Sequence, residues 1–325
     1  MRLQFSQVNY PNRKKYRQRQ VYIVRFHQTR VSISSKIKKI MLIRRFAKNW
    51  ISITVRIRNH EPGKIFLRNG LMIDEVKDLE SLIKLLSLGW KVEENSESFV
   101  VLKNQDDIKL KCRLKEGFDL GHILEIFESS TYLQDLKDST IIDVGASTAD
   151  SSVYFAVKGA KVVFGLEPMK ESFDIATYNV NINNLESKVH LINAALSYKT
   201  GRVEMIVSSQ NPNANSINPT ETVRAGGINF DSKRVVETIS LKDIVSQFSL
   251  IKIDLLKMDC EGCEYEVLQG LDEETYSRID SIILEFHDGI KFLADLLEEK
   301  GYNVRYDRPI GLGILKASRN IIKAD

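Results

Sequence analysis

The segment 251–270 is the part of this chain that most restricts how it can fold. An apolar stretch from Ile251 to Met258, interrupted by charged residues, is typical of a buried strand. Three acids and a glycine follow within residues 259–264, and helical spacing begins directly after them. In an open α/β sheet, ligands bind outside the carboxyl ends of the strands, so acids at this point are candidates for chemistry.

A second corner of the same kind lies upstream, at residues 141–147. An apolar strand again ends in an acid and a glycine, Asp143 and Gly145, before a helix that should begin near Thr148. Gly145 would let the backbone turn tightly and approach a ligand, and the first N–H groups of the helix would face the same space. Together the two corners predict a nucleotide-type cofactor site with a substrate site beside it.

The chain between these corners and beyond them alternates strand and helix, which predicts a mostly parallel sheet with helices on both faces. The last two strands read as a hairpin, so we expect an antiparallel strand at one edge of the sheet. The expected strands are 140–144, 161–166, 188–196, 252–258, 280–286, 302–306 and 312–316. The expected helices are 148–159, 169–183, 240–248, 264–270 and 289–300.

Residues 41–120 read as a small α+β region in front of a main domain at 121–325. Asn69-Gly70 between two apolar segments is a hairpin signal, 78–88 has helical spacing, and 99–102 with 108–114 could form another hairpin. Residues 41–58 fit either a strand or an amphipathic helix. The polar segment 208–232 is long for a compact domain, which is typical of a functional lid or of disorder.

Charge is distributed very unevenly along the chain. The first 60 residues hold 16 Lys or Arg and no acid, whereas the other 265 hold 31 basic and 43 acidic residues. We expect residues 1–40 to be a basic, disordered arm, with contact to nucleic acid or an anionic membrane as the alternative. No apolar run is long enough for a transmembrane segment, and three cysteines favour a reducing cytoplasm.

Several residues near the first corner suit a nucleotide-type cofactor. The second strand ends at Glu167-Pro168, where a carboxylate can accept hydrogen bonds from both ribose hydroxyls. The third strand ends at Asn193-Ala194-Ala195, where small side chains would leave room for an adenine. The spacing from Gly145 to Ala149 departs from the dinucleotide fingerprint, which argues against NAD.

These segments occur in an order that resembles the FkbM family of S-adenosylmethionine-dependent methyltransferases. The resemblance runs from about residue 125 to residue 317, and its most specific part is Lys-x-Asp-x-Glu-Gly-x-Glu at 257–264. It implies a Rossmann-like class I methyltransferase sheet with S-adenosyl-L-methionine as cofactor. The cofactor residues it implies, together with those suggested by the strand ends, are Asp143, Gly145, Ser147, Glu167, Pro168, Asn193 and Ala194. Ser147 and Ala149 stand where the family usually has Asn and Gly, so we expect a slightly altered turn with the cofactor still bound.

The second corner is then where the methyl acceptor would lie. Methyl transfer needs an aligned acceptor and, for a hydroxyl, removal of a proton. Asp259 is the first candidate for base or orienting group, and Glu261 beside it would raise its pKa. Glu285 and His287 fall on the same side of an extended segment, and His287 is the second candidate base.

The interpretation we favour is O-methylation of a hydroxyl on a sugar, lipid or secondary metabolite. An enzyme that modifies RNA or DNA through the basic arm is an alternative, disfavoured because the acids of the second corner repel phosphate. A cofactor-binding scaffold without turnover is another. Cys260 and Cys263 form a single CxxC, which is weak evidence for zinc or redox chemistry. We predict no metal, although Asp259, Glu261 and His287 could hold a divalent cation.

Overall fold

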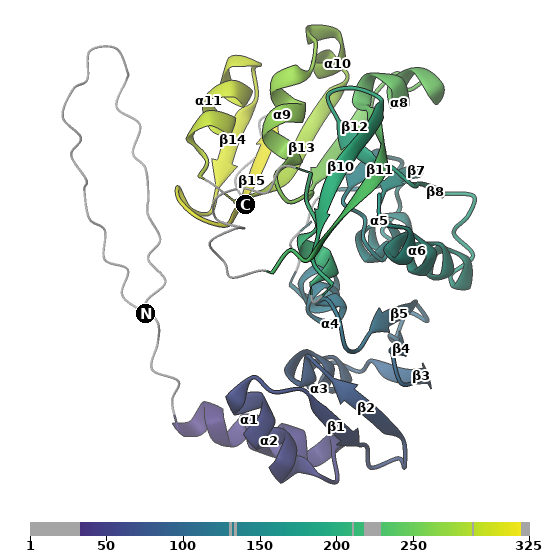
Figure 1. Cartoon of the computed structure of the whole chain (residues 1–325), viewed down its shortest axis with the longest axis vertical. Coiled ribbons are helices and arrows are strands. Elements are labelled where there is room, and N and C mark those ends of the chain that lie inside the picture. The colour runs from purple at the N-terminus through teal and green to yellow at the C-terminus, as the bar shows by residue number, and fades with distance from the viewer. Residues whose placement is uncertain are drawn as a thin grey trace, which may run out of the picture.

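The computed structural model describes residues 33–129, 132, 135–209, 211–217, 229–287 and 289–319. Its centre is a seven-stranded sheet in the order β14-β15-β13-β12-β6-β7-β8 (Figure 1). The strands are β6 (Thr140–Val144), β7 (Val162–Leu166), β8 (Val189–Ile192), β12 (Ile253–Met258), β13 (Ile279–Phe286), β14 (Asn303–Tyr306) and β15 (Gly313–Ser318). The expected mostly parallel α/β sheet is confirmed.

One detail of the predicted sheet is wrong. β15 runs antiparallel to β13 on one side and to β14 on the other. The antiparallel strand is therefore second from the edge, and β14 is the edge strand. The sequence shows that the last two strands form a hairpin, but it does not show that the second of them inserts beside β13.

Helices cover both faces of the sheet because neighbouring residues on each strand point to opposite sides. Ile141 and Leu255 pack with α5 (Asp150–Val157) and α6 (Lys170–Ile182). Ile142 and Leu256 pack on the other face with a second group of helices. These are α8 (Leu241–Gln247), α9 (Cys263–Gly270), α10 (Glu273–Ser277) and α11 (Lys291–Glu299).

A three-stranded sheet beside the main one was not predicted. It has the order β10-β11-β9, formed by β9 (Ala195–Ser197), β10 (Gly201–Val207) and β11 (Ser232–Ser240). Much of its surface is exposed and carries cross-strand ion pairs such as Arg202–Glu237 and Lys233–Glu204. β10 and β11 flank the segment 208–232 that was read as a polar loop, and β11 begins at its last residue, Ser232. The part of the loop at 218–228 lies outside the described residues.

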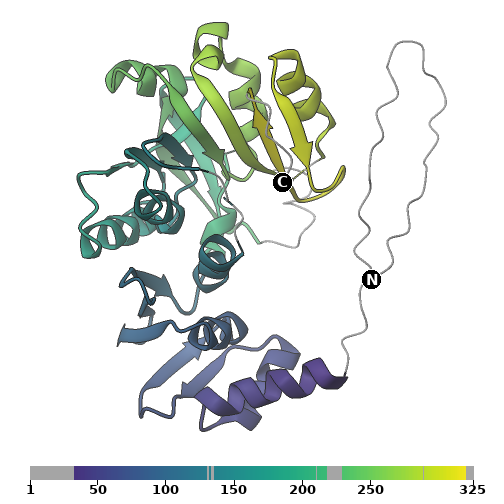
Figure 2. The same ribbon diagram turned by 180° about the vertical axis from the view of Figure 1, so that it is seen from behind.

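The N-terminal region forms its own small layer at one end of the molecule, as Figures 1 and 2 both show. It contains β1 (Gly63–Phe66), β2 (Met72–Val76), α3 (Leu79–Ser87), β3 (Lys91–Asn95), β4 (Phe99–Lys103) and β5 (Lys109–Arg113). Both predicted hairpins and the predicted helix are confirmed. Its apolar residues join those of α5 and the main sheet in one continuous core.

The beginning of the chain corrects the expected arm. α1 (Ile33–Phe46) and α2 (Trp50–Asn59) are helices, so residues 33–40 are helical, and 41–58 form helices joined by a short turn where a strand was the alternative. Ile43 and Ile53 are buried and anchor the two helices to the core. The arm prediction for residues 1–32 lies outside the described residues. Among those that are described, no helix is long and apolar enough to cross a membrane.

Candidate active site

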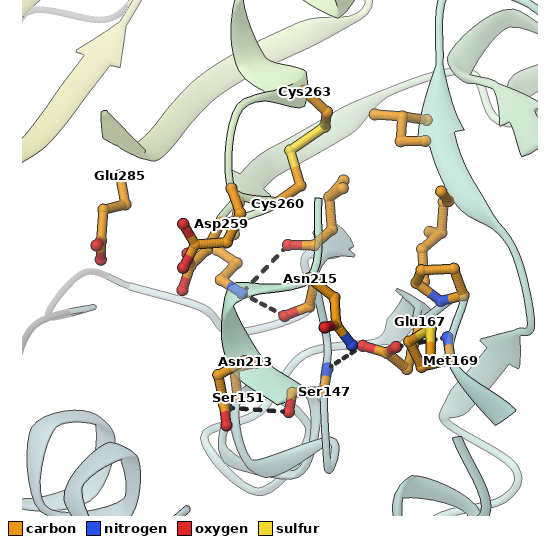
Figure 3. Close-up of a pocket in the computed structure, with 18 of the residues that line it drawn as sticks. Ser147, Ser151, Glu167, Met169, Asn213, Asn215, Asp259, Cys260, Cys263 and Glu285 are labelled. Carbon is orange, nitrogen blue, oxygen red and sulfur yellow. Dashed lines mark hydrogen bonds between the residues drawn. A yellow bond between two sulfur atoms is a disulfide. The ribbon is translucent and has the colours of Figure 1, made fainter. Parts of the chain in front are cut away.

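A cavity opens at the carboxyl ends of β6, β7, β12 and β13, where the two predicted corners meet. Figure 3 shows Glu167 and Met169 on one side of it, and Asp259 and Glu285 on the other. Of the predicted residues, the lining includes Gly145, Ser147, Glu167, Pro168, Asp259, Glu261 and Glu285. The structure therefore brings most of the residues of both corners to one site.

The two corners touch through Gly145. Its φ is +72°, and a Cβ built on it would lie 1.8 Å from the backbone oxygen of Asp259. The Asp259 N–H also donates to the Val144 carbonyl at 3.1 Å. A side chain at residue 145 would therefore push the two strand ends apart, which explains why glycine is needed here.

The buried side chain of Lys257 stabilises the contact between Gly145 and Asp259. This side chain is buried in β12, and Nζ lies 3.0 Å from the Gly145 carbonyl and 3.2 Å from the Val144 carbonyl. Nζ also lies 3.1 Å from the Asp143 carboxylate. Burial acts to lower the pKa of Lys257, but the charge and hydrogen bond of Asp143 together with the charges of Tyr132 and Asp259 outweigh it, so the pKa is raised and the lysine is charged. The sequence analysis gave Lys257 no role of its own.

Asp143 does not line the cavity. It is fully buried, and Oδ2 accepts hydrogen bonds from the hydroxyls of Ser151 and Ser152 at 2.7 and 2.6 Å. Together with the Lys257 ion pair, these contacts fasten the end of β6 to the start of α5. The side chain is placed to shape the Gly145 turn rather than to touch a ligand.

Glu167 ends β7 with its carboxylate at the cavity. Oε2 accepts from the Ser147 N–H at 3.0 Å and Oε1 accepts from the Met169 N–H at 2.7 Å, so the carboxylate is fixed in place. Burial raises its pKa to about 7, against the lowering effect of these two hydrogen bonds. A ligand that donates hydrogen bonds here would favour the charged carboxylate.

The turn between Gly145 and α5 holds two non-glycine residues in the left-handed region of backbone conformation. Ser147 and Ala149 have φ values of +46° and +61°, a conformation that costs non-glycine residues about 1–2 kcal/mol. These are the two positions where Asn and Gly were expected. The turn therefore carries backbone strain at both positions.

Asn193 and Ala194 are placed beside the cavity but not in its lining. Asn193 Nδ2 donates to the carbonyls of Glu167 and Pro168 at 2.8 and 3.1 Å, which steadies the end of β7. The next two residues, Ala195 and Leu196, line the cavity instead. Of the small residues predicted at this strand end, Ala195 lines the cavity, whereas Asn193 and Ala194 do not.

Carboxylates dominate the other side of the cavity. Asp259, Glu261 and Glu285 all line it, together with Glu125 from the π-helical turn η1 (Leu124–Glu128). Burial, followed by the nearby charge of Asp259, raises the pKa of Glu285 well above its usual range. The arrangement disfavours an anionic ligand at this end.

His287 lies behind these carboxylates rather than in the lining. Nε2 lies 2.9 Å from Glu261 and 3.7 Å from Glu285. Burial acts to lower the pKa of His287, but the hydrogen bond and charge of Glu261 outweigh it and raise the pKa to about 9. His287 is therefore protonated at neutral pH and donates to Glu261.

The turn that carries these acids is built on Glu264. This fully buried carboxylate accepts from the N–H groups of Cys260 and Gly262, both at 2.9 Å. Glu261 and Gly262 have positive φ values of 56° and 116°, so the turn is tight. It is closed by a disulfide between Cys260 and Cys263, which the sequence analysis did not expect.

The structure adds residues that the sequence analysis missed. Asp150 lines the cavity, and its Oδ2 is buried without a hydrogen-bond partner among the described residues. Asn213 and Asn215 reach the cavity from the segment predicted as a lid, and Asn213 Nδ2 lies 3.5 Å from the Ser147 hydroxyl. Long-range packing brought these residues in, and no spacing motif marked them.

Arg113 links the N-terminal region to this site. It forms a bidentate ion pair with Asp119 at 2.6–2.9 Å, and Nη2 lies 3.5 Å from the Ser147 hydroxyl. In the described part of the chain, no group of three or more His, Cys, Asp or Glu side chains is arranged to hold a metal ion.

The chain is similar in sequence to known methyltransferases. Residues 143–304 match the family model described as the methyltransferase FkbM domain. The chain is 28% identical over 212 residues to methyltransferase sdnD of Sordaria araneosa, covering 57% of this chain and 82% of that protein. It is 25% identical over 174 residues to 2-O-methyltransferase NoeI of Sinorhizobium fredii, covering 51% and 70%.

A solved structure is also similar. The crystal structure of methyltransferase FkbM from Methylobacillus flagellatus aligns with a TM-score of 0.39 and 13% identity. The alignment covers 87% of this chain and 59% of that one.

Proposed function

Since this chain belongs to the FkbM family of S-adenosylmethionine-dependent methyltransferases, we propose that it methylates a hydroxyl group on an uncharged sugar, lipid or secondary metabolite. The observation that carries the proposal is the contact between Gly145 and Asp259. It sets the cofactor corner directly against the backbone of Asp259, a residue that lines the same cavity.

The cavity residues fit the cofactor. Glu167 is fixed with both oxygens beside the cavity and can accept hydrogen bonds from ribose hydroxyls. Gly145 leaves the room that a Cβ would fill. The buried Asp150 Oδ2 accepts no hydrogen bond from the described residues and has only His122 Nδ1 near it, at 3.9 Å, and the cofactor's ammonium group is a suitable donor. When bound, S-adenosylmethionine supplies an electrophilic methyl group on a sulfonium.

The residues of the second corner then act on the acceptor. We assign Asp259 the role of orienting the hydroxyl and accepting its proton as the methyl group would pass from the sulfonium sulfur to the hydroxyl oxygen. His287 is held protonated by Glu261, so it is unsuited to be the base at neutral pH and instead positions Glu261. Glu285 tends to keep its proton, which lets it donate a hydrogen bond to a neighbouring acceptor oxygen.

The charge of this end supports an uncharged acceptor. Four carboxyl groups line it, at residues 125, 259, 261 and 285, and Lys257 faces the buried ion pair below. A phosphate or carboxylate next to the methylated group would be repelled. This argues against the nucleic-acid alternative at the reaction centre, while the 2-O-methyltransferase name of NoeI agrees with transfer to oxygen.

The experiment that tests the proposal incubates the enzyme with methyl-labelled S-adenosylmethionine and fractionated neutral glycans, lipids and metabolites. We expect the label in a product that resists mild alkali, as a methyl ether does and a methyl ester does not. Label recovered in RNA, in an amine or in an alkali-labile ester would contradict the proposal. Cofactor binding measured by calorimetry on the same sample shows that the protein is competent.

We also keep a cytoplasmic location as a proposal, based on the sparse cysteines. A reducing compartment would keep Cys260 and Cys263 as thiols, although the structure pairs them. Labelling of free thiols in freshly lysed cells tests this. Two labelled thiols at this turn are expected, and a protected pair would contradict the location.

A further inference from the structure

The helices α1 and α2 expose side chains that take no part in the proposed active site. Both lie at the end of the molecule opposite α10 in the two views (Figures 1 and 2). Their buried sides carry Ile43 and Ile53, which pack into the core.

The exposed positions repeat at helical spacing. On α1 and the turn after it, Ile37, Met41, Arg45 and Lys48 are exposed, and on α2 so are Ile51, Val55 and Arg58. Met41 is 66% exposed and Ile51 is 63% exposed, which is unusual for large apolar side chains on an otherwise well packed region. We call these seven residues and Lys38 the basic-apolar surface.

The charges on this surface have one sign. Residues 1–60 contain no Asp or Glu, so no acid lies along either helix. Lys39 pairs with Glu80 of α3, but no ion pair among the described residues involves Lys38, Arg45, Lys48 or Arg58. Apolar side chains flanked by uncompensated cations are the composition of helices that lie on anionic lipid.

We propose that the basic-apolar surface docks this enzyme on a membrane that contains anionic phospholipid. The aliphatic side chains enter the boundary between headgroups and acyl chains, while the lysines and arginines contact the phosphates. The rest of the chain has a net charge of about −12, so the same field repels it and orients the molecule with α1 and α2 towards the lipid. The inference depends on these helices and not on the proposed reaction.

Two other occupants fit less well. Binding to a nucleic acid uses cations along the phosphate backbone, and exposed isoleucine and methionine side chains would gain nothing there. A symmetric dimer would place this surface against its own copy, and the cations of the two copies would then face each other. An anionic lipid surface satisfies both the charge and the apolar side chains.

The test is flotation of the full-length protein with vesicles of phosphatidylcholine, with and without phosphatidylglycerol. We expect binding to the anionic vesicles alone, and release by salt. The double variant Met41→Glu/Ile51→Glu should lower the partition coefficient by about tenfold or more, because two apolar side chains that would enter the lipid are replaced by carboxylates. Replacing Lys38, Arg45 and Lys48 by Gln should lower it by about fivefold per residue.

The control variants replace the same kinds of exposed residue outside α1 and α2. Ile251→Glu replaces another exposed isoleucine, which is 86% exposed, and Lys188→Gln removes an exposed cation. Both should bind vesicles like the parent. All replaced positions are exposed, so unchanged thermal melting is expected and checks the fold.

Three outcomes would overturn the proposal. The first is equal binding to neutral and anionic vesicles, or no binding to either. The second is anionic binding that the α1–α2 variants do not change. The third is that the parent does not bind vesicles but binds RNA or forms a concentration-dependent dimer, and that the α1–α2 variants lose this property. That result would assign the surface to nucleic acid or to a second copy.

Discussion

Lys257 and Asp143 lie opposite each other on the adjacent parallel strands β12 and β6, with Nζ and Oδ1 3.1 Å apart and both side chains buried. The pair joins the strand that carries the acceptor corner to the strand that carries the cofactor corner. Since Nζ also reaches the carbonyls of Val144 and Gly145, the lysine fixes the turn on which both corners depend.

Breaking this pair should destabilise the fold strongly. Lys257→Met leaves the Asp143 carboxylate buried with serine hydroxyls as its remaining partners, and such a change costs about 3–5 kcal/mol of unfolding free energy. Urea unfolding of Lys257→Met, Asp143→Asn and the double variant measures the coupling. The double variant should lose less than the two single losses together, and strict additivity would show that the two residues do not act as a pair.

Glu167 should matter for cofactor binding more than for stability. Glu167→Ala removes hydrogen bonds to a charged group, worth about 1.5–3 kcal/mol, so S-adenosylmethionine should bind roughly 10- to 150-fold more weakly. Calorimetry checks this, with Glu171→Ala on the nearby exposed surface of α6 as the matched control. Parental affinity in a folded Glu167→Ala protein would remove this residue from the cofactor site.

Gly145→Ala should damage both corners together. The new Cβ would lie 1.8 Å from the Asp259 oxygen and would also sit at positive φ. The strand ends must then separate, so we expect a lower melting temperature and at least tenfold weaker cofactor binding. Gly70→Ala is the matched control, because Gly70 has a positive φ but no atom within 4 Å of the added Cβ. Similar losses in both variants would mean that strain alone, and not the contact, matters.

The stability of the protein should fall as the pH rises from about 5 to 9. The folded pKa of His287 is about 9, above the usual 6.5, so its contribution is complete below about pH 6.5 and is lost as the pH passes 9. Glu167 and Glu264 have folded pKa values of about 7, above 4.5, so the folded protein retains their protons longer and loses stability as they ionise.

Melting temperatures measured across this range check the sign. His287→Gln should flatten the curve between about pH 6.5 and 9 and leave the lower part unchanged. A parent protein that becomes more stable towards pH 9, or a His287→Gln curve that keeps the full slope, would contradict the protonated His287–Glu261 pair.

Local pattern was enough to predict the main sheet, because each strand there is an apolar run between turn residues and helices such as α11 carry one apolar side. It did not predict β10 and β11, which belong to a small separate sheet with few buried residues. Nor could it place β15 between β13 and β14, which depends on how the hairpin folds back. For α1, dense positive charge suggested disorder, while the anchor Ile43 appears only once the core is assembled.

The site residues likewise fall into two groups, those that a local pattern predicts and those that depend on tertiary packing. Residues that follow a strand directly, such as Gly145, Glu167 and Asp259, were predicted and do line the cavity. Asp143 and Asn193 come at the same strand ends, but their side chains turn to the backbone and to buried partners. Asp150 and Asn213 come from positions whose approach depends on tertiary packing.

The most direct test of the account measures cofactor affinity and methyl transfer side by side in Asp259→Asn, with the acceptor fraction that the parent enzyme labels. We expect the affinity of Asp259→Asn for S-adenosylmethionine to stay within a few-fold of the parent's. Its turnover should fall by about 10²–10⁴, the usual contribution of general acid–base catalysis. Turnover at the parental rate would contradict the role of Asp259, and a loss of affinity equal to the loss of turnover would contradict the division of the cavity into a cofactor corner and an acceptor corner.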